Sequence, residues 1–241
     1  MIQDMCIDGR PVIVFNSEGC YTFNFVEDET LPDEFLEIER VMRAVNLKYE
    51  YPVLLLEGGS DIDPEIYGQK NTYSHVSPFS QRRDRKEIFQ YNLARELGWA
   101  IFGICRGHQL MAALNGGTLH QDINVAGYHN HRGGNVVLKY QPLIDWAQSE
   151  TYYVNSMHHQ AINRLPENCL LTASAFDGIV EAVVYTDFQG ISYQWHPEFM
   201  SDRKLVEWSL QHLWEKECER QNNIRSGDRN TESTAELHQL R

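Results

Sequence analysis

Residues 100–117, AIFGICRGHQLMAALNGG, constrain the fold of this chain more than any other segment. An apolar run that ends at Ile104 is typical of a buried strand, and a helical pattern with Leu110 and Met111 on one side follows it. Between the two, a pair of glycines flanks Cys105 at G-x-C-x-G spacing, which allows a sharp turn of the backbone. The segment predicts a strand, a tight turn and a helix, with the sulfur projecting into solvent at the edge of a sheet.

Cys105 is a candidate nucleophile. The free N–H groups and the positive dipole end of the predicted helix favour the thiolate form of a cysteine at its start, and Arg106 adds positive charge nearby. A cysteine after a strand can also be a small core residue, and that alternative stays open for the cysteine taken alone. A nucleophilic thiol needs a base as well, which this segment does not supply.

A second segment, ISYQWHPEF at residues 191–199, offers that base. A strand is expected to end at Trp195, and His196, Pro197 and Glu198 follow it. The imidazole can accept a proton, the carboxylate can orient the imidazole, and the proline fixes the bend between them. Turn chemistry at a strand end is the alternative for H-P-E, but the two segments together predict one catalytic unit.

The remaining pattern is that of an α/β chain with a β-rich second half. Buried strands are expected at Pro11–Phe15, Tyr21–Val26 and Pro52–Leu56, and helices at Asp33–Leu47, Asp84–Gly98 and Asp202–Glu217. Short strands of antiparallel hairpins are expected at Asn135–Leu138, Tyr152–Val154, Leu170–Ala175, Ile179–Tyr185 and Gly190–Trp195. Segments 71–83 and 120–134 are expected to be irregular.

A glycine pair, Gly58 and Gly59, follows the apolar run Pro52–Leu56. At the carboxyl end of a parallel strand, such a pair can turn its backbone N–H groups towards a ligand in the crevice. A plain turn is the alternative.

Composition limits the class of protein. With 241 residues, 42% of them hydrophobic, residues 1–219 are expected to form a single domain and residues 220–241 a mobile polar tail. The net charge of −13 and the lack of a long basic run argue against a nucleic-acid partner. No apolar stretch is long enough to cross a membrane and Met1–Arg10 lacks the pattern of a signal peptide, so a cytoplasmic protein without membrane contact is expected.

Cysteine and histidine spacing gives no metal or disulfide signature. The five cysteines are odd in number and include no C-x-x-C pair, so neither a disulfide framework nor a zinc ribbon is indicated. The best candidates for a metal are His129-x-His131 and His158-His159, but neither has helical i, i+4 spacing. No metal site is expected.

GICRGHQ and QWHPE, in this order and at this separation, resemble the nucleophile and His–Glu segments of the class I glutamine amidotransferase superfamily. More narrowly, the chain resembles the gamma-glutamyl-gamma-aminobutyrate hydrolase family through LLLEGGSDIDPEIYG, RDRKE, GICRGHQLMAALNGGTLHQDI, NSMHHQAI, DGIVEAV and QWHPEF. The resemblance implies a three-layer, flavodoxin-like α/β fold, in which a mostly parallel central sheet carries an antiparallel β extension.

The resemblance also implies roles for individual residues and no cofactor. Cys105 would be the nucleophile, His196 the base and Glu198 the group that orients the base. The oxyanion hole would consist of backbone N–H groups of Gly58, Gly59 and Arg106. Contacts with the substrate are implied for Gln109, Asn155, Ser156 and His158.

The reaction implied by the resemblance is hydrolysis of a gamma-glutamyl amide, with a small-molecule substrate and a glutamyl-thioester intermediate. One alternative is a glutaminase subunit that supplies ammonia to a separate synthetase. A non-enzymatic binding protein is a third interpretation, which the complete triad disfavours. The amine released, the synthetase partner and a homodimer all stay open at this point.

Overall fold

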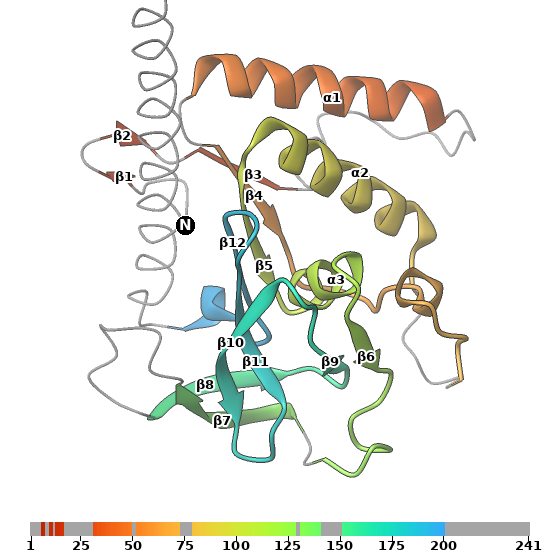
Figure 1. Cartoon of the computed structure of the whole chain (residues 1–241), viewed down its shortest axis with the longest axis vertical. Helices are drawn as coiled ribbons and strands as arrows, with labels where there is room; N and C mark the ends of the chain where they lie inside the picture. The colour runs from red at the N-terminus through yellow and green to blue at the C-terminus, as the bar shows by residue number, and fades with distance from the viewer. Residues whose placement is uncertain are drawn as a thin grey trace, which may run out of the picture.

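Strands and helices alternate through the first half of the chain (Figure 1). The computed structural model describes residues 6–7, 10–11, 13–16, 31–49, 52–72, 79–128, 131–140 and 151–200. The elements of the first half are β1 (Cys6–Ile7), β2 (Arg10–Pro11), β3 (Ile13–Asn16), α1 (Leu31–Lys48), β4 (Pro52–Leu56), η2 (Pro64–Tyr67), α2 (Gln81–Leu97), β5 (Ala100–Ile104) and α3 (Arg106–Leu114). Because helices α1 and α2 connect them, β3, β4 and β5 pair in parallel.

Short strands dominate the second half, as the turn spacing predicts. They are β6 (Thr118–His120), β7 (Arg132–Tyr140), β8 (Thr151–Met157), β9 (Ala161–Arg164), β10 (Cys169–Ala175), β11 (Val180–Tyr185) and β12 (Gly190–Tyr193), followed by the short helix η3 (Pro197–Phe199). The pairs β7–β8, β10–β11 and β11–β12 are antiparallel, which confirms the hairpins expected from the sequence.

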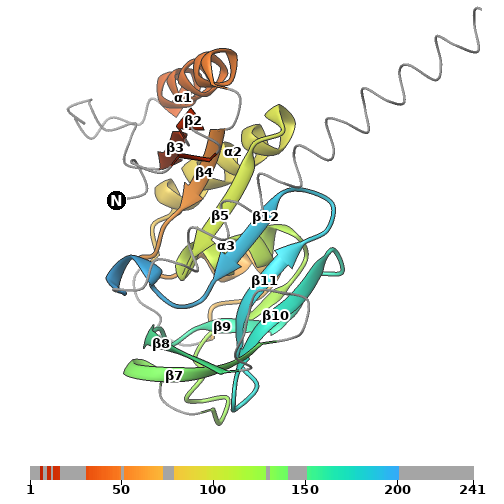
Figure 2. The ribbon, with the colours of Figure 1, turned by 90° about the vertical axis from the view of Figure 1, so that its left-hand side faces the viewer.

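One sheet of eight strands joins the two halves in the order β3-β4-β5-β12-β11-β10-β7-β8. The last strand, β12, returns to the middle of the sheet and pairs in parallel with β5, with Ile104 opposite Tyr193. The parallel part of the sheet is therefore β3-β4-β5-β12, and the antiparallel strands extend it (Figure 2). This register brings the carboxyl ends of β5 and β12 to one edge, although their sequences lie far apart.

The helices cover the parallel strands because their apolar faces need burial. Every residue of β4 is buried, which is typical of a central parallel strand. Helix α2 packs against β4 and β5, and α3 against β4, β5 and β12. Ser80 caps the start of α2 by accepting from the Arg83 N–H, and Gly98 ends it in the left-handed region at φ 74°. In the described part of the chain, no helix has the length and apolar character to span a lipid bilayer.

The observed elements differ from the expected ones mainly at their ends. Helix α2 begins three residues earlier than expected, since Ser80 is its cap, and the segment expected to be irregular after residue 120 overlaps the ends of β6 and β7. The strand expected to reach Trp195 ends at Tyr193. The α/β fold itself is confirmed. Three predicted segments lie outside the described residues: the strand at Tyr21–Val26, the helix at Asp202–Glu217 and the tail at 220–241. The contribution of the helix at Asp202–Glu217 to the expected three-layer arrangement therefore stays a prediction.

Candidate active site

Cys105 lies at a sharp turn between β5 and α3. Its backbone, with φ 48° and ψ −100°, is the only positive-φ conformation of a non-glycine residue in the described part of the chain. The Cys105 N–H donates to the Tyr193 carbonyl oxygen at 2.7 Å, which fixes the turn to β12. Such a conformation costs free energy and persists because the surrounding structure holds it. The turn thus has the geometry of a nucleophile elbow.

The two flanking glycines are required by close packing. A Cβ atom on Gly107 would lie 2.0 Å from the Leu56 carbonyl oxygen, and one on Gly103 would lie 2.7 Å from the Met111 sulfur. The absence of side chains therefore lets the start of α3 lie against β4. The G-x-C-x-G spacing in the sequence signals this contact.

Two expectations about the surroundings of Cys105 were wrong. The residue is 6% exposed rather than solvent-facing, because β5 lies inside the sheet between β4 and β12. The buried Arg106 guanidinium forms ion pairs with Asp84 and Glu87, whose carboxylates offset its charge. Its charge therefore does not act freely on the thiol, and the N-terminal end of α3 remains the backbone feature that favours a thiolate.

His196 lies between Cys105 and Glu198 in a hydrogen-bonded series. Its Nδ1 lies 2.6 Å from Glu198 Oε1, which fixes the tautomer because a carboxylate can only accept. Burial alone would lower the pKa of His196, but its hydrogen bonds to Cys105 and Glu198 and the charges of both groups raise that pKa to about 10. The arrangement therefore favours the imidazolium form of His196 beside the Cys105 sulfur.

Asn155, at the end of β8, holds the backbone of His196. Its side-chain amide donates to the His196 carbonyl oxygen at 2.6 Å, and its side-chain oxygen accepts from the His196 N–H at 2.8 Å. This two-way contact fixes the position of the residue after β12. Asn155 therefore has a structural contact beside the substrate contact expected for it.

The glycine loop after β4 lies directly against the Cys–His pair. A Cβ atom on Gly58 would lie 2.6 Å from His196 Cε1 and 3.5 Å from Cys105 Cβ. Gly59 has φ +150°, and its missing Cβ would overlap the Arg83 guanidinium at 2.1 Å. The structure thus brings Gly58, the elbow and His196 together, as a common oxyanion site requires.

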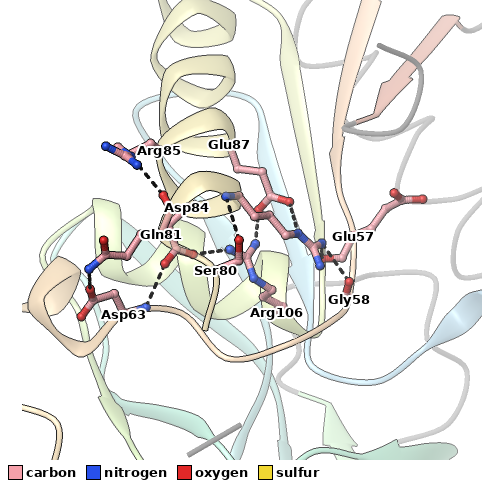
Figure 3. Close-up of polar contacts among 10 residues, drawn as sticks. Glu57, Gly58, Asp63, Ser80, Gln81, Asp84, Arg85, Glu87 and Arg106 are labelled. Atoms are coloured by element: carbon pink, nitrogen blue, oxygen red, sulfur yellow. Dashed lines mark hydrogen bonds and ion pairs between the residues drawn. The ribbon is translucent and has the colours of Figure 1, made fainter. Parts of the chain in front are cut away.

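A buried ionic network connects this glycine loop to the elbow (Figure 3). Arg83, on α2, donates to the Gly58 carbonyl oxygen at 2.9 Å and pairs with Glu87 at 2.7 Å. Glu87 and Asp84 in turn hold the Arg106 side chain. Asp84 also accepts from the Asp63 N–H at 3.1 Å, at the start of η2. The start of α2 therefore fixes the loop and the elbow relative to each other.

Sequence reasoning assigned no role to this network. The segment RDRKE was noted only for its resemblance, since charged residues on a helix are expected at the surface. Asp84, Lys86 and Glu87 are nevertheless buried. The available signal was the density of charged residues at the start of the predicted helix, together with an arginine at the predicted elbow.

The other predicted substrate contacts lie in buried hydrogen bonds. The Gln109 amide donates to the Gln160 carbonyl oxygen at 3.0 Å and to Gln194 Oε1 at 3.1 Å. Ser156 donates to the His131 carbonyl oxygen at 2.6 Å. His158 Nδ1 lies 2.9 Å from the Gln160 carbonyl oxygen. These contacts fix the three side chains, whose roles in substrate binding stay predictions.

One group of side chains has the composition and spacing of a metal site. His131, His158 and Glu181 are buried, and one potential ligand atom from each lies within 4.8 Å of the others. His131 directly precedes β7, His158 directly follows β8, and Glu181 is the second residue of β11. Sequence reasoning considered both histidines but searched for neighbouring partners, and the topology supplies Glu181 instead.

Residues 50–198 match the model of a protein family described as peptidase C26. The Mycobacterium tuberculosis protein named "Putative glutamine amidotransferase Rv2859c" is 35% identical over 156 residues, which cover 60% of this chain and 50% of that protein. The gamma-glutamyl-gamma-aminobutyrate hydrolase of Escherichia coli O157:H7 is 27% identical over 159 residues, which cover 59% of this chain and 61% of the hydrolase. The chain thus spans about half to three fifths of the length of these curated relatives.

The fold is similar to that of a solved structure as well. A crystal structure from Thermoplasma acidophilum, described as "a putative gmp synthase subunit a protein", aligns with a TM-score of 0.53 and 15% identity. The alignment covers 89% of this chain and 96% of the other. At that identity the likeness concerns the fold alone.

Proposed function

The chain belongs to the peptidase C26 family, and from that premise we propose that it is a cysteine amidohydrolase of gamma-glutamyl amines. The observation that carries the proposal is the geometry around Cys105. The thiol lies at a strained turn and at a helix start, beside an imidazole that Glu198 orients at 2.6 Å. This combination provides an activated nucleophile, a base and an orienting group in one place.

In the proposed reaction, the Cys105 thiolate attacks the side-chain carbonyl carbon of the gamma-glutamyl group. The carbonyl oxygen takes the negative charge of the tetrahedral intermediate. When the C–N bond breaks, the His196 imidazolium gives its proton to the leaving amine, and a glutamyl thioester remains on the sulfur. His196 then accepts a proton from water, which attacks the thioester and releases glutamate and the free thiolate.

Backbone N–H groups of Gly58, Gly59 and Arg106 are proposed to stabilise the oxyanion. The contact of Gly58 with both Cys105 and His196 supports this role, because donors must lie where the charge develops. Arg106 begins α3, so its N–H is one of the free groups at that helix start. Arg83 would keep the loop in place through its hydrogen bond to Gly58.

The choice of substrate class rests on the relatives. The resemblance to the gamma-glutamyl-gamma-aminobutyrate hydrolase of E. coli O157:H7 supports a gamma-glutamyl amine. The relative from M. tuberculosis, named a putative glutamine amidotransferase, favours a second candidate. In that case the chain would release ammonia from glutamine for a separate synthetase.

Measuring kcat/KM with the chain alone separates the two candidates. A stand-alone hydrolase should cleave gamma-glutamyl-gamma-aminobutyrate or a gamma-glutamyl polyamine more efficiently than glutamine, because the amine portion contributes binding energy in the transition state. A glutaminase subunit should prefer glutamine and show low turnover until its acceptor enzyme is added. Preference for glutamine over every amide tested would contradict the hydrolase proposal.

A further inference from the structure

We propose that His131, His158 and Glu181 bind a divalent transition-metal ion, zinc by ligand type, at a site separate from the Cys–His–Glu unit. All three side chains are buried, with exposed fractions of 2%, 4% and 0%. His131 Nδ1 and His158 Nε2 both face the Glu181 carboxylate, at 3.4 and 3.6 Å from Oε1. Two imidazoles and one carboxylate are a common ligand set for zinc.

The tautomer of each histidine is set by the hydrogen bond that its other ring nitrogen makes, on the side away from Glu181. The far nitrogen of His131, Nε2, lies 3.0 Å from Asp177 Oδ2, and the far nitrogen of His158, Nδ1, lies 2.9 Å from the Gln160 carbonyl oxygen. Both partners can only accept, so each neutral imidazole uses its single proton there. Each then turns a lone pair towards Glu181. A carboxylate or a carbonyl behind the imidazole is also the usual outer contact of a zinc-bound histidine.

With both imidazoles neutral, the result is a cluster of acceptors without a donor. Apart from the contacts of the two imidazoles with Glu181 at 3.4 and 3.6 Å, His131 Nδ1, His158 Nε2 and both oxygens of Glu181 have no hydrogen-bond partner among the described residues. Leaving buried polar atoms unpaired is costly, and leaving a buried carboxylate without a countercharge costs more. A divalent cation would satisfy all three ligands and would balance the charges of Glu181 and Asp177 together.

The distances favour a metal over shared protons. Hydrogen bonds of the N–H···O type cluster at about 2.9–3.0 Å, which is shorter than both contacts to Glu181. Ligands at about 2.0–2.2 Å from a tetrahedral ion lie roughly 3.3–3.6 Å from one another. The contacts at 3.4 and 3.6 Å match two edges of that tetrahedron, and the ligand atoms of the two histidines lie within 4.8 Å of each other. Water would complete the fourth position.

The backbone holds the two histidines in this arrangement before any ion binds. The His158 N–H donates to the His131 carbonyl oxygen at 3.1 Å, and their ring centroids lie 4.9 Å apart. The Gln160 carbonyl oxygen that accepts from His158 also accepts from Gln109. The ion would therefore fix three strands of the antiparallel extension and, through Gln160, the position of Gln109. Its role would be structural.

Metal binding is tested on the full chain without a histidine tag, stripped with a chelator and titrated with Co²⁺ and then Zn²⁺. We expect stoichiometric uptake, the visible absorption of four-coordinate Co²⁺ and displacement by Zn²⁺. At a free Zn²⁺ concentration a hundredfold above Kd, Tm should rise by about 5–10 °C. Failure of the wild-type chain to take up either ion would overturn the proposal, and protonated imidazoles would then balance Glu181.

Three variants localise the ion. Glu181→Gln should lose the Co²⁺ spectrum, and Asp177→Asn should weaken binding by about 10–100-fold because Asp177 only orients His131. The control His120→Gln removes a histidine of β6 that lies outside the cluster and should bind like the wild type. Equal binding by Glu181→Gln would place the ion elsewhere. If this variant does not fold, the wild-type titration and Asp177→Asn still decide, and none of these results depends on the proposed hydrolase activity.

Discussion

The backbone conformation of Cys105 is unfavourable, and it also determines where the thiol lies. This positive-φ backbone conformation is unfavourable for a side chain with a Cβ, yet it turns the thiol towards His196 at the start of α3. The free energy that this conformation costs is offset by the N–H···O bond to Tyr193 and by the packing of Gly103 and Gly107. The backbone geometry of the turn therefore positions the thiol for its contact with His196.

Replacing Cys105 with Ala should abolish turnover, with a loss of at least about 1,000-fold, and leave the fold intact. Iodoacetamide should label Cys105 faster than Cys169, because burial raises the pKa of the Cys169 thiol to about 11. Peptide mapping after a brief reaction measures both rates in one sample. Equal labelling of the two residues would remove Cys105 as the activated thiol.

The carboxylate of Glu198 should control the alkaline limb of the pH–rate profile. Because Glu198 helps to raise the pKa of His196 to about 10, the imidazolium keeps its proton into the alkaline range. Glu198→Gln removes part of that effect, so the alkaline limb should move to lower pH. This variant should also retain more activity than His196→Ala, since an orienting group contributes less than the base. An unchanged profile would assign the orientation of His196 to another group.

Gly58 is predicted to tolerate no side chain. Its Cβ would lie 2.6 Å from His196 Cε1, so Gly58→Ala should displace the imidazole and lower kcat by more than about 100-fold. Ser60→Ala, in the same loop, is the control and should keep normal activity. The two variants are compared by kcat and by Tm. Normal kcat in Gly58→Ala would mean that the loop moves freely.

At the scale of elements, the start of α2 joins the loop after β4 to the start of α3. Arg83 contacts the loop, and the carboxylates of Asp84 and Glu87 hold Arg106. The charges of Asp84, Glu87 and Arg106 are buried, so their pairing matters more than that of surface ion pairs. The helix therefore acts as a brace behind the site rather than only as a cover for the sheet.

Glu87→Gln should destabilise the fold by about 3–5 kcal/mol, because it removes one partner from a buried ionic network. Glu37→Gln breaks the exposed pair with Arg40 on α1 and serves as the control, with no measurable change expected. Urea denaturation of both variants gives the free energies of unfolding. Similar small effects in both would show that the buried network contributes little.

Elements were predictable from the sequence where periodicity and backbone chemistry coincide. Pro52–Leu56 agrees with β4 residue for residue, since an uninterrupted apolar run between a proline and a glycine pair has few other solutions. The short strands β6 and β9 were not predicted, because a strand of three or four residues with half-exposed ends carries no clear alternation. The buried charges of α2 were missed because their partners come from residues far along the chain.

At the scale of the whole molecule, the return of β12 to the centre of the sheet creates the site. It places His196 beside Cys105 although 91 positions (196 − 105) separate them in the chain. The sequence alone could identify Cys105 and His196 as candidate catalytic residues, and the resemblance to the family could assign both to one triad. The pairing of β5 with β12, the position of Asn155 and the cluster around Glu181 depend on this long-range topology, which no local pattern encodes.

The most direct test of the central claim is a pre-steady-state assay with a gamma-glutamyl anilide, whose activated leaving group makes formation of the thioester fast. The wild-type chain should release one burst of aniline equal to the enzyme concentration, and acid quenching should leave a glutamyl group on the peptide that contains Cys105. Cys105→Ala should show neither the burst nor the adduct. Turnover by Cys105→Ala, or a glutamyl adduct on any other residue, would contradict the account.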